Sequence, residues 1–348
     1  MRDGVGEVMR AVVVHGAGKL RVDRVDRPEV GTDGVLVRVA FGGICGSDLH
    51  YYQHGRNGIY ELQAPLVLGH EIVGRVEAVG ADVGGDLRVG TPVAIHPATP
   101  TPPPGGAAGQ GLHLAYGGSY LGSASTRPHT QGGFADFVRV MPDQLRPLPD
   151  GLPLRRAALA EPLAVALHGV DRYDGDYAEK RVLVSGAGPI GCLAIAALRR
   201  RGAAEIVATD MWEHPLRIAR EVGADDTRRL GYDQPLEEDS FDVVIEASGA
   251  PAATVSALRL VRRGGTIVQL GMLPDGDLPV PLASLVSREV TLRGSQRFDI
   301  ELDESVRVLA EAPEIDAVVS HVFPAKDALA AFETAADSRQ STKVLLEF

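Results

Sequence analysis

Three side chains that can bind a borderline-soft metal cation lie within one short stretch of the chain. Cys45 supplies a thiol, His70 an imidazole and Glu71 a carboxylate, the donor types that Zn²⁺ prefers in proteins. The run from Glu71 to Val79 mixes apolar residues with glycine, which predicts a strand that bends or approaches other backbone closely. We therefore expect His70 and Glu71 at the start of a strand, facing a site that Cys45 enters from a neighbouring loop.

A second candidate site is a glycine-rich turn. It has the pattern G-x-G-x-x-G between a predicted strand at 181–185 and a predicted helix at 192–201. In that context the helix N-terminus binds the pyrophosphate of a dinucleotide.

An aspartate 19 residues after the last glycine ends the next predicted strand. Its carboxylate would accept hydrogen bonds from the adenosine ribose and repel a 2′-phosphate, which favours NAD over NADP. The alternative is a glycine turn without a nucleotide. The predicted cofactor-binding residues are Gly186, Gly188, Pro189, Ile190, Gly191 and Asp210.

A metal site next to a nicotinamide suggests hydride transfer from an alcohol. The hydroxyl must lose its proton near neutral pH, and a Lewis acid such as zinc promotes this loss. The proton then has to leave a dry site, which a hydroxyl and an imidazole can relay. Ser47 and His50 lie close to Cys45 in the sequence and are suited to that relay. A purely structural role is the alternative for His50.

Composition excludes several classes of protein. The chain has 348 residues, which favours about two domains, and its net charge is −11. We therefore expect no nucleic-acid partner and no anionic membrane surface. No apolar run approaches the ~20 residues of a membrane helix. The two cysteines, Cys45 and Cys192, exclude a disulfide framework and fit a reducing, cytoplasmic location.

The element pattern predicts two kinds of domain. Short Val-rich strands at 11–15, 20–25 and 35–41 suggest an antiparallel, mostly-β part. One long helix is expected at 155–173, and after it strands alternate with helices, which indicates a doubly wound parallel sheet. The remaining predicted elements are strands at 71–79, 91–95, 134–140, 205–209, 241–246, 266–270, 289–293 and 343–348, and helices ending at 221 or spanning 252–261, 300–310 and 325–336.

The sequence resembles the zinc-dependent medium-chain alcohol dehydrogenases, most of all their polyol branch. The resemblance runs from about residue 10 to the C-terminus, and its most specific motif is G-H-E-x-x-G-x-x-x-x-x-G-x-x-V at 69–83. It implies an α/β fold with a GroES-like catalytic domain at 1–156, completed by 294–348, and a Rossmann NAD-binding domain at 157–293. Further matching motifs are G-G-I-C-G-S-D-L-H-Y-Y (42–52), A-P-L-V-L-G-H-E (64–71), A-E-P-L-A-V-A-L-H (160–168), G-A-G-P-I-G-C-L (186–193) and R-G-S-Q-R-F (293–298).

The resemblance also assigns roles to single residues. It implies that Cys45 and His70 ligate zinc, and that Glu71 either ligates directly or lies just behind the metal. Glu161 would hold a zinc-bound water or enter the coordination shell. Substrate contacts are implied for Tyr51, Glu161 and Arg297. An arginine there makes chemical sense, since a guanidinium binds the carboxylate of a sugar acid in bidentate fashion; a surface ion pair is the alternative.

Two departures from the family pattern affect these expectations. Relatives usually bind a structural zinc through four cysteines, whose positions here correspond to Thr101, Pro104, Ala107 and Ala115. None of these residues can ligate, so we predict one zinc per chain, with a Pro-Gly-rich loop at 97–125 in place of the second site. Gln296 stands where relatives often have an aromatic residue, which would widen or polarise the pocket.

The predicted activity is zinc- and NAD-dependent oxidation of a secondary alcohol of a sugar acid, with L-idonate to 5-keto-D-gluconate as the leading reaction. Sorbitol, xylitol, cyclitol and threonine-type dehydrogenases are the alternative enzymes. A non-catalytic NAD-binding sugar sensor is the alternative outside the enzyme class, although a sensor has no need of a Lewis acid. The expected partners are a small-molecule substrate and further copies of the chain, in a homodimer or homotetramer.

Overall fold

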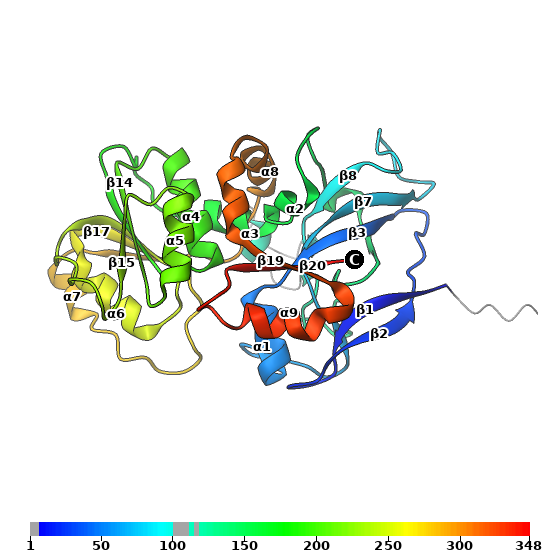
Figure 1. The fold of residues 1–348 in the computed structure, drawn as a ribbon, viewed down its shortest axis with the longest axis horizontal. Helices are drawn as coiled ribbons and strands as arrows, with labels where there is room; N and C mark the ends of the chain where they lie inside the picture. Colours follow the sequence, from blue (N-terminus) through cyan, green and yellow to red (C-terminus); the bar gives the residue numbers. More distant parts are fainter. Residues whose placement is uncertain (1–6, 100–110, 115–117) are drawn as a thin grey trace, which may run out of the picture.

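The computed structural model describes residues 7–99, 111–114 and 118–348. Figure 1 shows strands in blue and cyan at one end of the molecule and a sheet covered by helices, in green and yellow, at the other. The C-terminal strands, in red, return to the blue end. The N-terminal and C-terminal segments therefore share one half of the molecule.

The first half is built on a mostly antiparallel sheet. Its strand order is β12-β8-β7-β3-β20-β19, and β11 also pairs with β3. The strand predicted at 71–79 is confirmed as β7, and Gly74 inside it allows the close approach of β3, because a Cβ atom there would lie 2.1 Å from the carbonyl oxygen of Arg38. The strands are β3 (Val35–Gly43), β7 (Glu71–Val79), β8 (Pro92–Ile95), β11 (Phe137–Val140), β12 (Leu145–Pro147), β19 (Val319–Pro324) and β20 (Lys343–Glu347).

Smaller elements complete this half. A three-stranded sheet has the order β2-β1-β6, and two-stranded sheets join β4 to β5 and β9 to β10. Helix α1 follows the end of β3 and begins directly after Cys45. The elements are β1 (Val8–Val14), β2 (Leu20–Asp26), α1 (Gly46–His54), β4 (Arg56–Asn57), β5 (Tyr60–Glu61), β6 (Leu66–Val67), β9 (Ala98–Thr99), η1 (Leu112–Leu114), β10 (Ser119–Tyr120) and η2 (Pro142–Gln144).

The second half is a six-stranded parallel sheet. Its order β15-β14-β13-β16-β17-β18 is that of a doubly wound dinucleotide-binding fold, which confirms the predicted parallel sheet. Its central strands are apolar and fully buried because helices cover both faces. The elements are β13 (Arg181–Ser185), α4 (Pro189–Arg200), β14 (Glu205–Asp210), α5 (Glu213–Glu221), β15 (Asp226–Arg229), β16 (Phe241–Glu246), α6 (Pro251–Leu260), β17 (Val261–Gln269), α7 (Ala283–Ser287) and β18 (Thr291–Gly294).

The single helix predicted at 155–173 is wrong. The structure has two helices there, α2 (Leu154–Ala157) and α3 (Ala160–Val170). Pro162 explains the break, because in one continuous helix its ring would clash with the carbonyl group of Ala158. A helix that restarts at Ala160 places Pro162 in its first turn, where no backbone N–H is needed.

The chain after Gly294 returns to the first half. It forms α8 (Leu302–Glu311), η3 (Pro313–Val318), η4 (Ala325–Asp327) and α9 (Ala328–Ala335), in addition to β19 and β20. Strand β20 pairs antiparallel with β3, with Leu345 opposite Gly43. This pairing supports the domain limits that we propose, 1–156 with 294–348 and 157–293.

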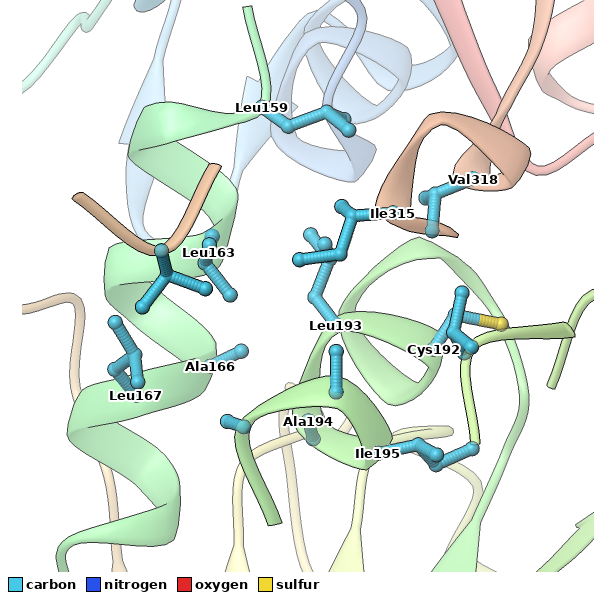
Figure 2. Packing of buried hydrophobic residues seen from close by; sticks show 14 of the residues in the cluster. Leu159, Leu163, Ala166, Leu167, Cys192, Leu193, Ala194, Ile195, Ile315 and Val318 are labelled. Carbon is cyan, nitrogen blue, oxygen red and sulfur yellow. The ribbon is translucent and has the colours of Figure 1, made fainter. Parts of the chain in front are cut away.

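The interface between α3 and α4 is part of the largest apolar core. Figure 2 shows Leu163 on α3, Leu193 on α4 and Ile315 on η3 converging on one region. All three side chains are fully buried. Cys192 is buried in the same core, where a free cysteine packs as a small apolar residue. The core thus joins the nucleotide-binding sheet to the helices that lead to and from the other half.

From the sequence, we matched four positions to the cysteines of a structural zinc site. These positions lie outside the described residues; they are Thr101, Pro104, Ala107 and Ala115. Within the described part of the chain, no helix is both long and apolar enough to cross a membrane.

The α3–α4 core generates a stability prediction. Leu193→Ala should lower the free energy of unfolding by about 2–5 kcal/mol, because it leaves a cavity that rigid neighbours cannot fill. Urea unfolding followed by circular dichroism measures the change. Leu329→Ala, at an exposed position on α9, should cost less than about 1 kcal/mol. Equal losses for the two variants would show that the α3–α4 contact does not limit stability.

Candidate metal and cofactor site

The structure brings Cys45, His70 and Glu71 together. One potential ligand atom from each residue lies within 4.8 Å of the other two. Glu71 begins β7 and lies opposite Gly43 of β3, while Cys45 lies in the short connection from β3 to α1. His70 and Glu71 are buried and Cys45 is half-buried. The predicted donors therefore form one group, which is most accessible on its thiol side.

Asp48 holds two of these donors in place. Its Oδ2 atom accepts a hydrogen bond from the Cys45 backbone N–H (3.0 Å), and Oδ1 accepts one from Gly69 N–H (3.2 Å). Oδ1 also lies 3.9 Å from His70 Nδ1. Burial raises the pKa of this fully buried carboxyl group. One carboxylate thus ties the start of α1 to the loop before β7 and places a negative charge next to the imidazole, where residues behind a metal ligand are commonly found.

Lys343 of β20 binds the third donor. Its Nζ atom lies 2.6 Å from Glu71 Oε1 and 2.7 Å from Oε2, and also donates to the carbonyl oxygen of Ile44. The two side chains are only 2% and 1% exposed. Burial lowers the pKa of Lys343, but the charges of Glu71 and Cys45 outweigh it and raise the pKa. The ammonium group is therefore charged at neutral pH.

A glycine makes room for this ion pair. A Cβ atom on Gly43 would lie 2.0 Å from Glu71 Oε2, so any larger residue would push the carboxylate away. The pair joins residues 272 positions apart in the sequence. It therefore fixes the start of β7 to the C-terminal strand β20.

The charge balance of the group favours a bound cation. Burial lowers the pKa of His70, but the charges of Asp48 and Cys45 outweigh it and raise the pKa to about 10. The surroundings of the imidazole therefore favour a positive charge at this position, such as a proton on the ring. A divalent cation would supply that positive charge instead.

Glu161 and Arg297 reach the same site through a residue that the sequence interpretation missed. Tyr120 donates its hydroxyl hydrogen to Glu161 Oε1 at 2.6 Å. Its ring centroid lies 5.6 Å from that of His70, and the Arg297 guanidinium carbon lies 4.0 Å from the Tyr120 centroid. Burial, followed by the charge of Glu161, raises the pKa of Tyr120, so the phenol is a neutral donor. Tyr120 belongs to no motif, and its surroundings predict only a loop.

The segment that carries Arg297 is held from several sides. Arg297 has φ +50°, an uncommon conformation for a residue with a side chain, and Phe298 after it is buried. The carbonyl oxygen of Asp299 lies 3.3 Å from His96 Nε2. Glu301 accepts from Asp299 N–H (2.7 Å) through one oxygen and lies 2.7 Å from His168 Nδ1 through the other. These contacts fix the backbone on which Arg297 depends.

The other predicted catalytic and substrate residues lie on α1. Ser47 is half-buried and His50 is exposed, three positions apart on the same side of the helix. Tyr51 lies in the apolar core of the mostly-β half, where its hydroxyl oxygen accepts from Ala124 N–H (3.0 Å). The relay and the contact of Tyr51 with substrate remain predictions.

The glycine-rich turn has the geometry that the fingerprint requires. A Cβ atom on Gly191 would lie 1.9 Å from the carbonyl oxygen of Gly186, whereas one on Gly188 would have open space. Gly191 therefore allows helix α4 to pack on the turn, and Gly188 leaves room for a phosphate. Pro189 and Ile190 begin α4. Asp210 ends β14, and its carboxylate accepts from the backbone N–H groups of Ala187 (2.9 Å) and Trp212 (3.0 Å).

A dinucleotide-binding turn and a thiol–imidazole–carboxylate group in the same chain are the combination expected of a metal-dependent dehydrogenase. Comparison with known families agrees. Residues 31–150 match the alcohol dehydrogenase GroES-like domain, and residues 189–311 match the zinc-binding dehydrogenase domain. The chain belongs to the zinc-dependent alcohol and polyol dehydrogenase family.

Individual relatives cover nearly the whole chain. L-idonate 5-dehydrogenase (NAD(P)⁺) of Escherichia coli is 37% identical over 91% of this chain and 92% of its own. Sorbitol dehydrogenase of Gallus gallus is 35% identical over 93% and 92%. The crystal structure of the E. coli L-idonate 5-dehydrogenase has a TM-score of 0.90 at 35% identity, covering 98% and 99%. A putative zinc-binding dehydrogenase from Sinorhizobium meliloti, bound to NADP, has a TM-score of 0.89 at 30% identity, covering 98% and 100%.

The buried ion pair generates a prediction for the metal-free protein. Lys343→Met should lower its free energy of unfolding by about 3–5 kcal/mol, because the Glu71 carboxylate is left buried without a partner. Denaturant unfolding in the presence of a chelator measures this loss. The double variant Lys343→Met/Glu71→Gln should recover most of it, and Lys326→Met, at an exposed position, should change little. No loss in Lys343→Met would contradict a stabilising ion pair.

The contacts of Glu301 generate a pH prediction. Burial raises the pKa of Glu301, but the hydrogen bonds from His168 and from Asp299 N–H outweigh it and lower the pKa to about 2. Since the folded pKa lies below the ordinary value of 4.5, the stabilisation is present above pH 4.5 and is lost as the pH falls toward 2. Glu301→Gln should therefore cost about 1–2 kcal/mol at pH 7, allowing for solvent screening.

The check is unfolding of wild type and Glu301→Gln at several pH values. The difference between them should shrink between pH 4.5 and pH 2. Glu311→Gln, which removes an exposed ion pair with Arg200, should show a small difference at every pH. A Glu301→Gln difference that is independent of pH would refute the explanation.

Proposed function

We propose that this enzyme oxidises a secondary alcohol of a sugar acid with NAD, and that L-idonate, converted to 5-keto-D-gluconate, is its substrate. The observation that carries the proposal is the position of Arg297. Its guanidinium stacks on Tyr120, whose hydroxyl reaches Glu161 beside the metal-ligand group. A guanidinium there can bind a substrate carboxylate while a hydroxyl of the same molecule reaches the metal. The resemblance to the E. coli L-idonate 5-dehydrogenase supports the assignment.

The donor set of Cys45, His70 and Glu71 suits zinc, since it combines thiolate, imidazole and carboxylate within one compact group. Bound there, zinc would act as a Lewis acid for the alcohol oxygen. Asp48 places a negative charge next to His70, and Lys343 holds Glu71. We propose Glu161 as the acceptor for a water or substrate hydroxyl. Ser47 and His50 would relay the alcohol proton, and His50, which is exposed, would release it to solvent.

We propose one zinc per chain. The chain has two cysteines, Cys45 and Cys192, and Cys192 is buried in the apolar core. A four-cysteine structural site therefore cannot form.

We propose NAD as the preferred cofactor because Asp210 ends β14, where a carboxylate repels a 2′-phosphate. Arg229 lies opposite Asp210 on the neighbouring strand β15. Its Nε–H donates to the carbonyl oxygen of Met211 at 3.2 Å, and its guanidinium stacks on Tyr232 at 3.8 Å. Arg229 is thus engaged by these neighbours, which leaves Asp210 to decide the preference.

We further propose a homodimer or homotetramer in the cytoplasm. The edge strand β18 and the adjoining helix α7 expose Leu292 and Val286, and an exposed strand edge next to apolar side chains favours pairing with another copy. The reducing compartment is supported by the low cysteine content.

A sorbitol, xylitol, cyclitol or threonine-type substrate is the alternative, and the sorbitol dehydrogenase relatives make a neutral polyol the strongest of these.

Wild-type protein should contain about one zinc per chain by elemental analysis and should reduce NAD with L-idonate. Arg297→Ala should raise KM for L-idonate about 10- to 100-fold, the range for a lost charged hydrogen bond, and change KM for sorbitol little.

Arg293→Ala is the matched control. It removes another arginine close by, one that pairs with Asp174, and should leave both KM values unchanged. If the protein oxidised sorbitol but not L-idonate, the role proposed for Arg297 would be contradicted, while oxidation of a secondary alcohol would still be supported. If the protein contained no zinc and turned over neither substrate, a non-catalytic NAD-binding sugar sensor would become the favoured interpretation.

A further inference from the structure

Tyr120 contacts three groups of different chemistry. Its hydroxyl donates to the Glu161 carboxylate at 2.6 Å, its ring lies 5.6 Å from the imidazole of His70, and the Arg297 guanidinium stacks on the same ring at 4.0 Å. The residue is buried and belongs to β10, which pairs with β9. One fixed side chain therefore lies between a metal donor and both polar groups of the proposed substrate pocket.

The hydroxyl group determines where Glu161 sits. Within the described residues, the compact donor group contains Cys45, His70 and Glu71 but not Glu161. Glu161 is instead oriented by the short hydrogen bond from Tyr120. The short hydrogen bond favours the present direction of the Glu161 carboxylate, because turning Oε1 toward the metal donors would break its contact with the phenol. Without the hydroxyl, this oxygen would be free to turn toward the metal.

The ring determines where Arg297 sits. The backbone of Arg297 has φ +50° and is fixed on its C-terminal side by the buried Phe298. Its long side chain would otherwise sample many rotamers. Stacking on the ring of Tyr120 at 4.0 Å gives the guanidinium one preferred position.

We propose that Tyr120 is a positioning residue with two separable effects, an extension that rests on the proposed function. Its hydroxyl keeps Glu161 out of the metal-ligand set, so that this carboxylate serves a water or substrate hydroxyl. Its ring keeps Arg297 at the point where a substrate carboxylate binds. Specificity for a sugar acid over a neutral polyol thus depends on a residue that itself need not bind the acid group.

The first test concerns the hydroxyl and uses cobalt(II) in place of zinc, because its d–d absorption bands report the ligands of the metal. Tyr120→Phe keeps the ring and removes the hydroxyl. We expect shifted d–d bands without substrate and slower loss of cobalt to a chelator, by about tenfold, the scale on which neighbours of metal ligands alter affinity. In the Glu161→Gln background the same substitution should cause no further shift. Unchanged bands in Tyr120→Phe, or a shift that persists with Glu161→Gln, would overturn the proposal.

The second test concerns the ring. Tyr120→Leu should raise KM for L-idonate about tenfold relative to Tyr120→Phe, the scale of one lost charged contact, with KM for sorbitol within about twofold. A parallel rise for both substrates would show a general defect and reject the role of the ring. If the wild type does not oxidise L-idonate, the proposed function fails, and the cobalt spectra alone decide whether Tyr120 positions Glu161.

Tyr177→Phe is the matched control for both tests. Tyr177 is also buried, and its hydroxyl donates to the carbonyl oxygen of Val170 at 2.8 Å, remote from the metal donors in sequence. Its substitution should cost similar stability but leave the cobalt bands and both KM values unchanged. Equal spectral shifts in the two phenylalanine variants would reject a specific role for Tyr120.

Discussion

The ion pair between Lys343 and Glu71 is the interaction on which the site depends most. Both charges are withdrawn from water, which is costly unless each is fully engaged by the other and by further hydrogen bonds. The ammonium group meets both carboxylate oxygens and the carbonyl oxygen of Ile44, so the pair is well satisfied. Because Lys343 comes from the last strand, the Glu71 carboxylate at the start of β7 gains its partner only when the C-terminal segment has joined the sheet.

The path of the chain supplies this partner, since the chain leaves the first half, builds the parallel sheet and then returns to pair β20 with β3. Strand β20 adds to β3 beside the point where β3 faces Glu71. Gly43 at this crossing leaves space for the carboxylate. A chain that ended after β18 would keep Cys45, His70 and Glu71 but would leave Glu71 without its partner. The return of the chain is thus part of the site as well as of the fold.

The fold was predictable from sequence wherever the pattern was local. The strand at 181–185, the glycine turn and the aspartate at the end of the next strand are consecutive, and so are Gly69, His70 and Glu71. The prediction failed where one residue overrode a longer pattern, as Pro162 did in the helix expected at 155–173. It also missed β15, whose polar sequence Asp226–Arg229 has no apolar run to mark it.

The site was predictable only in its donor atoms, since residue type identifies a ligand but not what holds it. Asp48 lies inside a recognised motif, yet its two backbone contacts depend on a turn that only the structure shows. Lys343 and Tyr120 meet the donors from distant parts of the chain.

The type of reaction is thus predicted by short motifs around Cys45, His70 and Gly186. The proposed substrate pocket instead depends on contacts among residues 120, 161 and 297, which lie on separate segments of the chain. Relatives that share the motifs can therefore share the chemistry while substitutions at these three positions change the substrate.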